Sequence, residues 1–299
     1  MQALLHRLIL SPNFIFRPEL DEDINSSEAQ ELSSYELASR LSYFLWGSMP
    51  DDELFAKAAD NSLKDSQVLR SQVARMIDSP HAEVLTNVFA AQWLGFGNYD
   101  PLYYPTRRKN GIAESTAFVN FVIQNNLPAS ELITADYTFL NGYLANQYGM
   151  YDYEAASVDH FFVHIWADDS ERKNIGMLGH FSFLGSFPTL RSRGLWAMQR
   201  LQCDNPDLFF SSELDTHPLI STQPPADLKS KPKELAEWYQ DESPECRDCH
   251  SKFEPIGYAF GNFTEAGSWR ENYSDGTAID TTGTLPEGDF SGTVELASV

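Results

Sequence analysis

Residues 246–270 read CRDCHSKFEPIGYAFGNFTEAGSWR, and this stretch decides how the rest of the chain is interpreted. It opens with two cysteines three positions apart, Cys246 and Cys249, followed at once by His250. Two thiols at this spacing on a helical turn can reach the two vinyl groups on one edge of a porphyrin, and the adjacent imidazole can then bind the iron. The motif therefore predicts one covalent haem c, with His250 as the proximal iron ligand.

Three alternatives to haem attachment stay open for this motif. Chance is one, although the chain has only three cysteines in 299 residues. Zinc is another, since Cys203 with Cys246, Cys249 and His250 would form a Cys3His set, but an adjacent Cys and His rarely bind the same zinc. A dithiol–disulfide redox motif is the third, and it normally follows a strand in a βαβ unit that this sequence lacks. Haem attachment is favoured. Because thioether bonds to haem are made outside the cytoplasm, we expect a periplasmic or extracellular protein.

The residues after the motif supply candidates for the haem pocket. Pro255 follows His250 by five positions, and in many c-type cytochromes a proline carbonyl placed in this way accepts the Nδ1 hydrogen of the proximal histidine. The alternative for Pro255 is a simple turn with Gly257. Trp269 and Arg270 are candidates to hold haem propionates, through an indole N–H and a guanidinium. Packing and surface charge are the alternatives for these two side chains.

The second axial ligand of the iron is not evident, because no Met or His follows His250 in the chain. His180 is the first candidate, and its alternative is a hydrogen-bonded core histidine. The remaining options are an open site, a ligand from another module, or the side chains Met177, Met198 and His217. Arg191 and Arg193 are further candidates to pair with propionates, with surface charge as their alternative.

Composition narrows the class of protein. Hydrophobic residues make up 42% and aromatic residues 13% of the chain, which indicates a globular protein with a real core. Acidic residues outnumber basic ones 43 to 21, giving a net charge of -22, and this excludes nucleic acid as a partner. The sequence contains no apolar run of about 18 residues, so no transmembrane segment is expected in it.

The pattern along the chain predicts a mainly α fold. Ser33 and Ser34 can cap a helix carrying Leu37, Leu41, Phe44 and Leu45. Further helices are expected from 49–53 onward, around 68–77, from Ser79-Pro80 through Leu94, at 114–124, at 141–149, in the latter part of 172–203 and at 232–241. Residues 204–232 favour a loop, and Asp275-Gly276 favours a hairpin turn in a small β region at the C-terminus.

Four segments resemble one family. The haem stretch, with Pro255-Ile256-Gly257, Asn262-Phe263 and Gly267 to Arg270, looks like the haem module of planctomycete- and myxobacterial-type multi-domain exported cytochromes, whose modules are catalogued as domains of unknown function. The following IDTTGTLPEGDFSG also fits. The helical module of this family is similar to 37–54 and 133–150, and the start of its haem module is similar to 175–203. Residues 1–19 resemble the tail of a preceding helical module.

This resemblance implies a tail of a preceding module at 1–30, a helical module at 31–150, a linker at 151–171 and a c-type haem module at 172–299. Both chain ends read as cuts through a longer protein, so we expect the export signal to lie outside this sequence. Electron transfer to a redox partner protein, or to other modules of the same chain, is the favoured function. The alternatives are a peroxidase-like or oxidative haem enzyme acting on an organic or polymeric substrate, and a cell-surface polymer-binding module with an ancillary haem.

Overall fold

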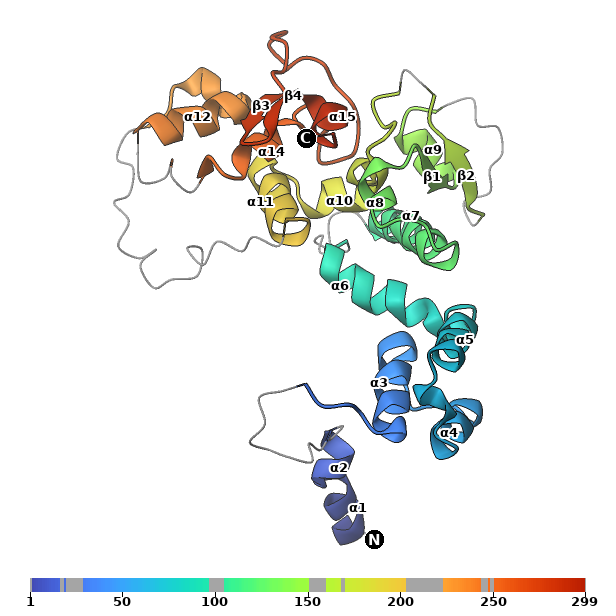
Figure 1. The fold of residues 1–299 in the computed structure, drawn as a ribbon. Helices are drawn as coiled ribbons and strands as arrows, with labels where there is room; N and C mark the ends of the chain where they lie inside the picture. The colour runs from blue at the N-terminus through green and yellow to red at the C-terminus, as the bar shows by residue number, and fades with distance from the viewer. Residues whose placement is uncertain are drawn as a thin grey trace. The chain divides into compact units, whose positions relative to one another are not determined.

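The computed structural model describes residues 2–16, 19, 29–96, 105–150, 160–167, 170–202, 223–242, 247 and 250–298. It is mainly helical, as the sequence predicts, with two small antiparallel strand pairs. The chain forms two compact units, Met1–Phe89 and Ala90–Val299, which are coloured along the chain in Figure 1. No helix in the described part of the chain has the length and apolar character needed to cross a membrane.

The first unit is built from short helices. In chain order they are α1 (Gln2–Ile9), α2 (Pro12–Ile15), α3 (Ser34–Trp46), α4 (Asp52–Ala59), the 3-10 helix η1 (Ser62–Lys64), α5 (Ser66–Ile77) and the 3-10 helix η2 (Pro80–Ala82). The predicted cap of α3 is confirmed, because the Ser33 side chain accepts from the Glu36 backbone N–H and the Glu36 carboxylate accepts from the Ser33 backbone N–H.

The buried face of α3 differs from the predicted one. Phe44 was expected in the core but is 62% exposed, whereas Ala38 and Ser42 are fully buried. These two side chains are small, so the neighbouring helices α4 and α5 can approach α3 closely on this side. The helix predicted from Ser79-Pro80 through Leu94 is also divided. It contains η2, the π-helix η3 (Leu85–Ala90) and the α-helix α6 (Ala91–Leu94).

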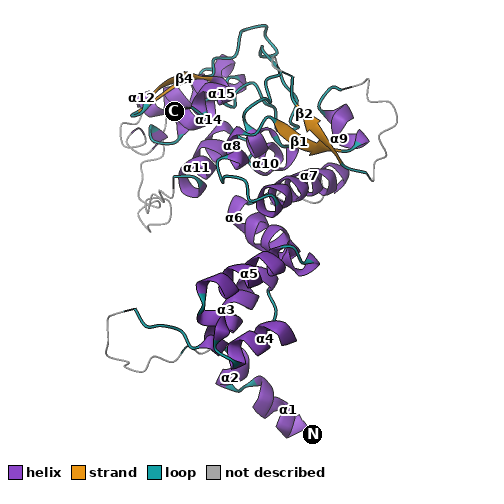
Figure 2. Cartoon of the chain, turned by 45° about the vertical axis from the view of Figure 1, so that its right-hand side comes forward, coloured by secondary structure: helices purple, strands orange, loops and turns teal. Residues whose placement is uncertain are grey.

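The second unit begins with α6 and continues with three helices and the two strands of a small sheet. These are α7 (Pro105–Gln124), α8 (Glu131–Thr134), β1 (Tyr137–Leu140), α9 (Gly142–Gln147) and β2 (Phe162–Ile165). Strands β1 and β2 pair antiparallel, with Tyr137 opposite Ile165, and Figure 2 shows them in orange beside α7 and α9. The segment expected to be a linker, 151–171, therefore contributes a strand.

The remaining elements lie on either side of the C-x-x-C-H motif in the sequence. They are the 3-10 helix η4 (Gly176–Gly179), α10 (Phe181–Ser186), α11 (Leu190–Arg200), η7 (Ala226–Ser230), α12 (Pro232–Glu242), α14 (Glu254–Tyr258), β3 (Thr282–Leu285), β4 (Gly288–Ser291) and α15 (Gly292–Leu296). Strands β3 and β4 form a hairpin in the small C-terminal β region that the sequence predicts, although its turn lies between Leu285 and Gly288 and not at Asp275-Gly276. The Asp275-Gly276 turn is present as well, with Gly276 at φ +85 and an isolated bridge from Asn272 to Ala278.

One continuous core joins the helices of the second unit. Its largest fully buried members include Phe118 of α7, Phe183 of α10, and Phe253 and Phe260 around α14. Trp196 of α11 is 3% exposed, stacks edge-on against Phe183 and donates from Nε1 to the Leu94 carbonyl at 2.7 Å. Side chains of α11 and α14 both belong to this core, so it packs α11 against the helix that follows the C-x-x-C-H motif.

Candidate haem-binding site

His250 lies just before α14 and is anchored by Glu254, four residues later. Its Nδ1 is 2.8 Å from Oε1 of Glu254, and its side chain is 19% exposed. Residues four apart on a helical segment lie on the same face, which explains how the sequence brings these two groups together. Because Nδ1 donates to a carboxylate, the other ring nitrogen, Nε2, is left as the nitrogen that can bind a metal.

Two other helices supply partners to the Glu254 carboxylate of α14, which is only 1% exposed. Arg191 of α11 donates from Nε to Oε1 at 3.0 Å, and Gln240 of α12 donates from Nε2 to Oε2 at 2.6 Å. Burial by itself would raise the pKa of Glu254, but the hydrogen bond from His250 and the charge of Arg191 together lower it below its usual value. The carboxylate is therefore ionised and held in one orientation.

Pro255 does not have its predicted role in this structure. The group that accepts from His250 Nδ1 is the Glu254 carboxylate, not the Pro255 carbonyl. The Pro255 carbonyl instead lies against the C-terminal hairpin, where a Cβ on Gly283 would come within 3.0 Å of it. Helix α14 begins at Glu254, so the proline occupies an early helical position, where its missing N–H leaves no intrahelical bond unmade.

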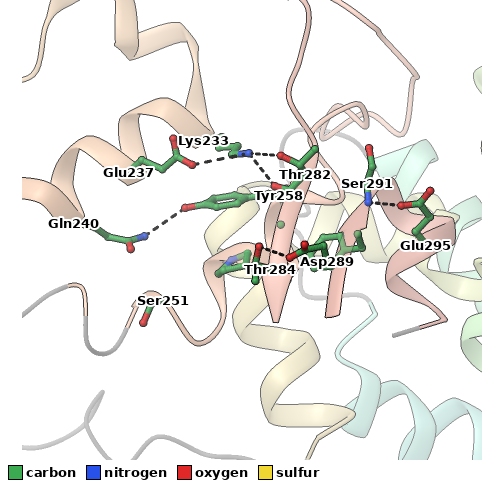
Figure 3. A pocket seen from close by; sticks show the side chains of 13 residues that line it. Lys233, Glu237, Gln240, Ser251, Tyr258, Thr282, Thr284, Asp289, Ser291 and Glu295 are labelled. Carbon is green, nitrogen blue, oxygen red and sulfur yellow. Dashed lines mark hydrogen bonds and ion pairs between the residues drawn. The ribbon is translucent and has the colours of Figure 1, made fainter. Parts of the chain in front are cut away.

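A polar cleft of about 750 Å³ lies beside the motif, between α12, α14 and the β3–β4 hairpin. Figure 3 shows Lys233 reaching from α12 toward Thr282 and Glu237, with Gln240 pointing at the Tyr258 hydroxyl. Ser251 and Pro255 form part of its wall. A volume of this size falls within the range of about 300–1,000 Å³ that is usual for small-molecule sites.

The described part of the haem motif suits a haem. His250 is a partly exposed imidazole with one nitrogen fixed by a buried carboxylate, which is the arrangement that metal-ligating histidines use. Arg247 ties the motif to α12 through bonds to the Gln240 carbonyl and the Asp241 carboxylate. Cys246 and Cys249 lie outside the described residues, as does Cys203, so the zinc alternative stays open. Within the described part, no group of three or more His, Cys, Asp or Glu side chains could hold a metal ion.

His180, the first candidate for the distal ligand, lies in a buried polar cluster and is 2% exposed. Its Nδ1 is 3.0 Å from Ser115 Oγ, and its Nε2 is 3.0 Å from Thr138 Oγ1. Burial and the charge of Arg172 lower the pKa of His180 to about 3, so the ring is neutral. Since both nitrogens already have partners, the structure favours the alternative of a hydrogen-bonded core histidine.

The other candidates for the distal iron ligand do not take the place of His180. Met177 and Met198 are 0% and 2% exposed and belong to the hydrophobic core, in keeping with the alternative of core filling. His217 lies outside the described residues. The described residues therefore supply no distal ligand from this set of candidates.

The arginines also divide into distinct roles. Arg193 is 1% exposed and donates to five backbone carbonyls, those of Leu184, Phe187, Phe260, Phe263 and Thr264. A guanidinium used in this way has no donors left for a propionate, so the expectation for Arg193 is corrected to a structural role. Arg191 is engaged with Glu254.

Trp269 and Arg270 lie on the irregular segment after α14. Trp269 is 37% exposed, packs edge-on against Phe263 at 4.9 Å, and lines a different cleft, together with Tyr148, Trp166 and Arg172. The Arg270 guanidinium lies 5.7 Å from the centre of the Tyr273 ring. The structure thus gives both side chains packing partners and does not place them with His250. Their predicted contact with haem stays a prediction.

Glu254 and Gln240 were not predicted from the sequence. A signal for Glu254 was present, because a carboxylate four residues after the histidine of a C-x-x-C-H motif reaches the ring if the segment is helical. Gln240 gave no such signal, since it comes from a separate helix. Its contact with Glu254 depends on how α12 packs beside α14.

Two family models match this chain. PSD4, described as a protein of unknown function (DUF1592), matches residues 32–150, and PSCyt3, described as a protein of unknown function (DUF1588), matches residues 176–273. The chain therefore contains two domains of the planctomycete cytochrome c-associated type, one in each matched segment. The second match contains the C-x-x-C-H motif and α14. No curated protein and no solved structure matches the chain.

Proposed function

We propose that this chain is the haem-bearing part of an exported multi-domain cytochrome, with one haem c bound through Cys246, Cys249 and His250. The observation that carries the proposal is the C-x-x-C-H motif whose histidine is oriented by the buried Glu254 carboxylate. Membership in a family of cytochrome c-associated domains supports it.

A bound haem would supply reversible one-electron chemistry, and electron transfer between modules or to a partner protein is the favoured use. The residues of the chain have separate parts in this. Glu254 fixes the tautomer and rotation of the His250 ring, and Arg191 and Gln240 fix Glu254. The core packs α11 and α14 against each other, and such packing favours electron exchange with little rearrangement.

A haem enzyme acting on an organic or polymeric substrate is the second candidate, and two observations favour it. The first is that neither His180 nor the two core methionines is free to act as a distal ligand. The second is the cleft in Figure 3, whose wall includes Ser251, the residue next to His250. An open iron position beside such a cleft would admit a small molecule.

The spin state of the iron separates these two functions. The chain would be produced with a periplasmic export leader and haem-maturation machinery, and the oxidised and reduced absorption spectra would be recorded. A sharp, low-spin reduced α-band supports electron transfer. A covalent but high-spin haem moves the assignment to the enzyme, and a protein that binds zinc and no haem overturns both.

A further inference from the structure

The hydrogen bond between His250 and Glu254 has a consequence for the haem itself. A neutral carbonyl, the acceptor expected from Pro255, takes a hydrogen bond of ordinary strength from an imidazole. A carboxylate takes a charge-assisted bond, which is about twice as strong. The stronger bond moves negative charge onto the ring and makes its other nitrogen a better electron donor.

We propose that Glu254 is the positioning residue of the proximal histidine, that it gives the His250 ring partial imidazolate character, and that it thereby holds the haem at a low reduction potential. This inference rests on the proposed function, because it needs a haem at His250. A more strongly donating ligand stabilises the ferric ion over the ferrous ion, so the reduced state becomes harder to populate.

The surroundings of Glu254 explain why its effect is not dissipated by solvent. The side chain is 1% exposed, and its two oxygens are held by partners from α11, α12 and the motif. The Arg191 guanidinium, which is half exposed, donates to the same carboxylate oxygen as the His250 ring. Arg191 draws part of the carboxylate charge, so it opposes the effect of Glu254 on His250.

Because Glu254 and Arg191 act in opposite directions, variants at these two positions should shift the reduction potential with opposite sign. Glu254→Gln keeps the size of the side chain but removes its charge. We expect the reduction potential to rise by about 59 mV, which for one electron is a tenfold increase in the ferrous-to-ferric ratio. Arg191→Gln leaves the carboxylate with His250 and Gln240 only, and we expect the potential to fall by a smaller amount.

The matched control is Asp241→Asn. It removes the same charge from a carboxylate on α12, but Asp241 is 78% exposed and pairs with Arg247 of the motif, not with His250. If the loss of a negative charge near the motif were the whole cause, Asp241→Asn would also raise the reduction potential, by an amount that solvent screening reduces. A positioning effect would leave the control near the parent value.

The experiment is a potentiometric titration of the three variants and the parent as holoproteins, with NMR of the hyperfine-shifted His250 ring resonances in the cyanide-bound ferric form. The inference predicts a raised potential and shifted ring resonances for Glu254→Gln, and the opposite shifts for Arg191→Gln. Equal shifts for Glu254→Gln and Asp241→Asn, with unchanged ring resonances, would overturn it. If Glu254→Gln fails to fold, Arg191→Gln alone tests the inference. An unchanged or raised reduction potential in that variant would then contradict it. A parent without covalent haem would instead refute the proposed function.

Discussion

Single side chains in this protein have roles that their residue type alone does not reveal. Glu254 and Arg193 are both nearly fully buried charged residues, yet one orients the candidate iron ligand and the other binds five backbone carbonyls. In the sequence, Arg191 and Arg193 are equal candidates as propionate partners, because both are cations close to family motifs. The helical spacing separates them, since Arg193 faces the core and Arg191 faces Glu254.

Arg193 gives the first prediction about stability. Arg193→Lys would leave three donors to satisfy five carbonyls, so at least two buried acceptors would lose their partners. We expect the free energy of unfolding to fall by about 2–4 kcal/mol, measured by chemical denaturation. Arg200→Lys, at the exposed end of the same helix, should change it by less than about 0.5 kcal/mol. Unchanged stability together with a changed haem spectrum would restore the propionate role.

At the scale of the elements, the contact between α11 and α14 positions the segment that follows the C-x-x-C-H motif. Helices α11 and α14 approach so closely that a Cβ on Gly257 would come within 2.1 Å of the Leu190 carbonyl oxygen, and one on Gly194 within 2.0 Å of the Phe253 carbonyl oxygen. The glycine of the Pro-Ile-Gly step, Gly257, is thus a packing requirement, as is Gly194. This close contact brings Arg191 of α11 to the start of α14, where Glu254 lies.

Gly257→Ala tests this helix contact. Because backbone atoms, and not a flexible side chain, would meet the new methyl group, we expect a loss of about 2 kcal/mol or more in the free energy of unfolding. Gly276→Ala is the matched control. It has a positive φ but no heavy atom within 4 Å of an added Cβ, so it should cost only the conformational strain of about 1 kcal/mol. A loss for Gly257→Ala no larger than that for Gly276→Ala would contradict the close helix contact.

At the scale of the whole molecule, a buried polar cluster links the two segments that match family models. Glu114 of α7 is fully buried, and it accepts from Thr138 Oγ1 at 2.8 Å and from the Tyr148 hydroxyl at 2.7 Å. Thr138 also contacts His180, and the Tyr148 hydroxyl accepts from the Phe181 backbone N–H. The first segment supplies the carboxylate side of this cluster, and the second supplies the histidine.

This cluster makes stability depend on pH. Burial raises the pKa of Glu114 from 4.5 to about 7, although the hydrogen bonds from Tyr148 and Thr138 oppose the shift. A carboxyl group with a raised pKa contributes stability that is fully present below about pH 4.5 and is lost as the pH rises through about 7. The lowered pKa of His180 acts the other way, and its contribution is present above about pH 6.5 and is lost as the pH falls toward 3.

Glu114→Gln isolates the carboxyl contribution. The variant cannot lose a proton at this position. Between pH 4.5 and pH 8, its free energy of unfolding should therefore rise relative to that of the parent, by on the order of 3 kcal/mol. Urea denaturation across this pH range measures the difference. Glu271→Gln, at an exposed residue of the same unit, is the matched control. A course parallel to that of the parent for Glu114→Gln would show that Glu114 titrates normally.

Local signals in the sequence predicted much of this fold, and tertiary contacts account for what they missed. The capping box of Ser33, the helix around 232–241 and the C-terminal hairpin each depend on a few neighbouring residues. Pairing of β1 with β2 was not predicted, because the strands are short and come from segments more than 20 residues apart. The Glu254–Gln240 contact was missed for the same reason. The motif located the candidate site, but the acceptor of the His250 proton depends on helix packing.

Covalent attachment of haem is the central claim, and intact-mass spectrometry tests it most directly. The chain would be exported with haem-maturation machinery and denatured before measurement, alongside a Cys246→Ala, Cys249→Ala double variant. We predict that the parent keeps the mass of one haem after denaturation and that digestion assigns it to a peptide containing 246–250, while the double variant keeps none. A parent at its bare polypeptide mass, under conditions that load a known c-type cytochrome, would contradict the claim.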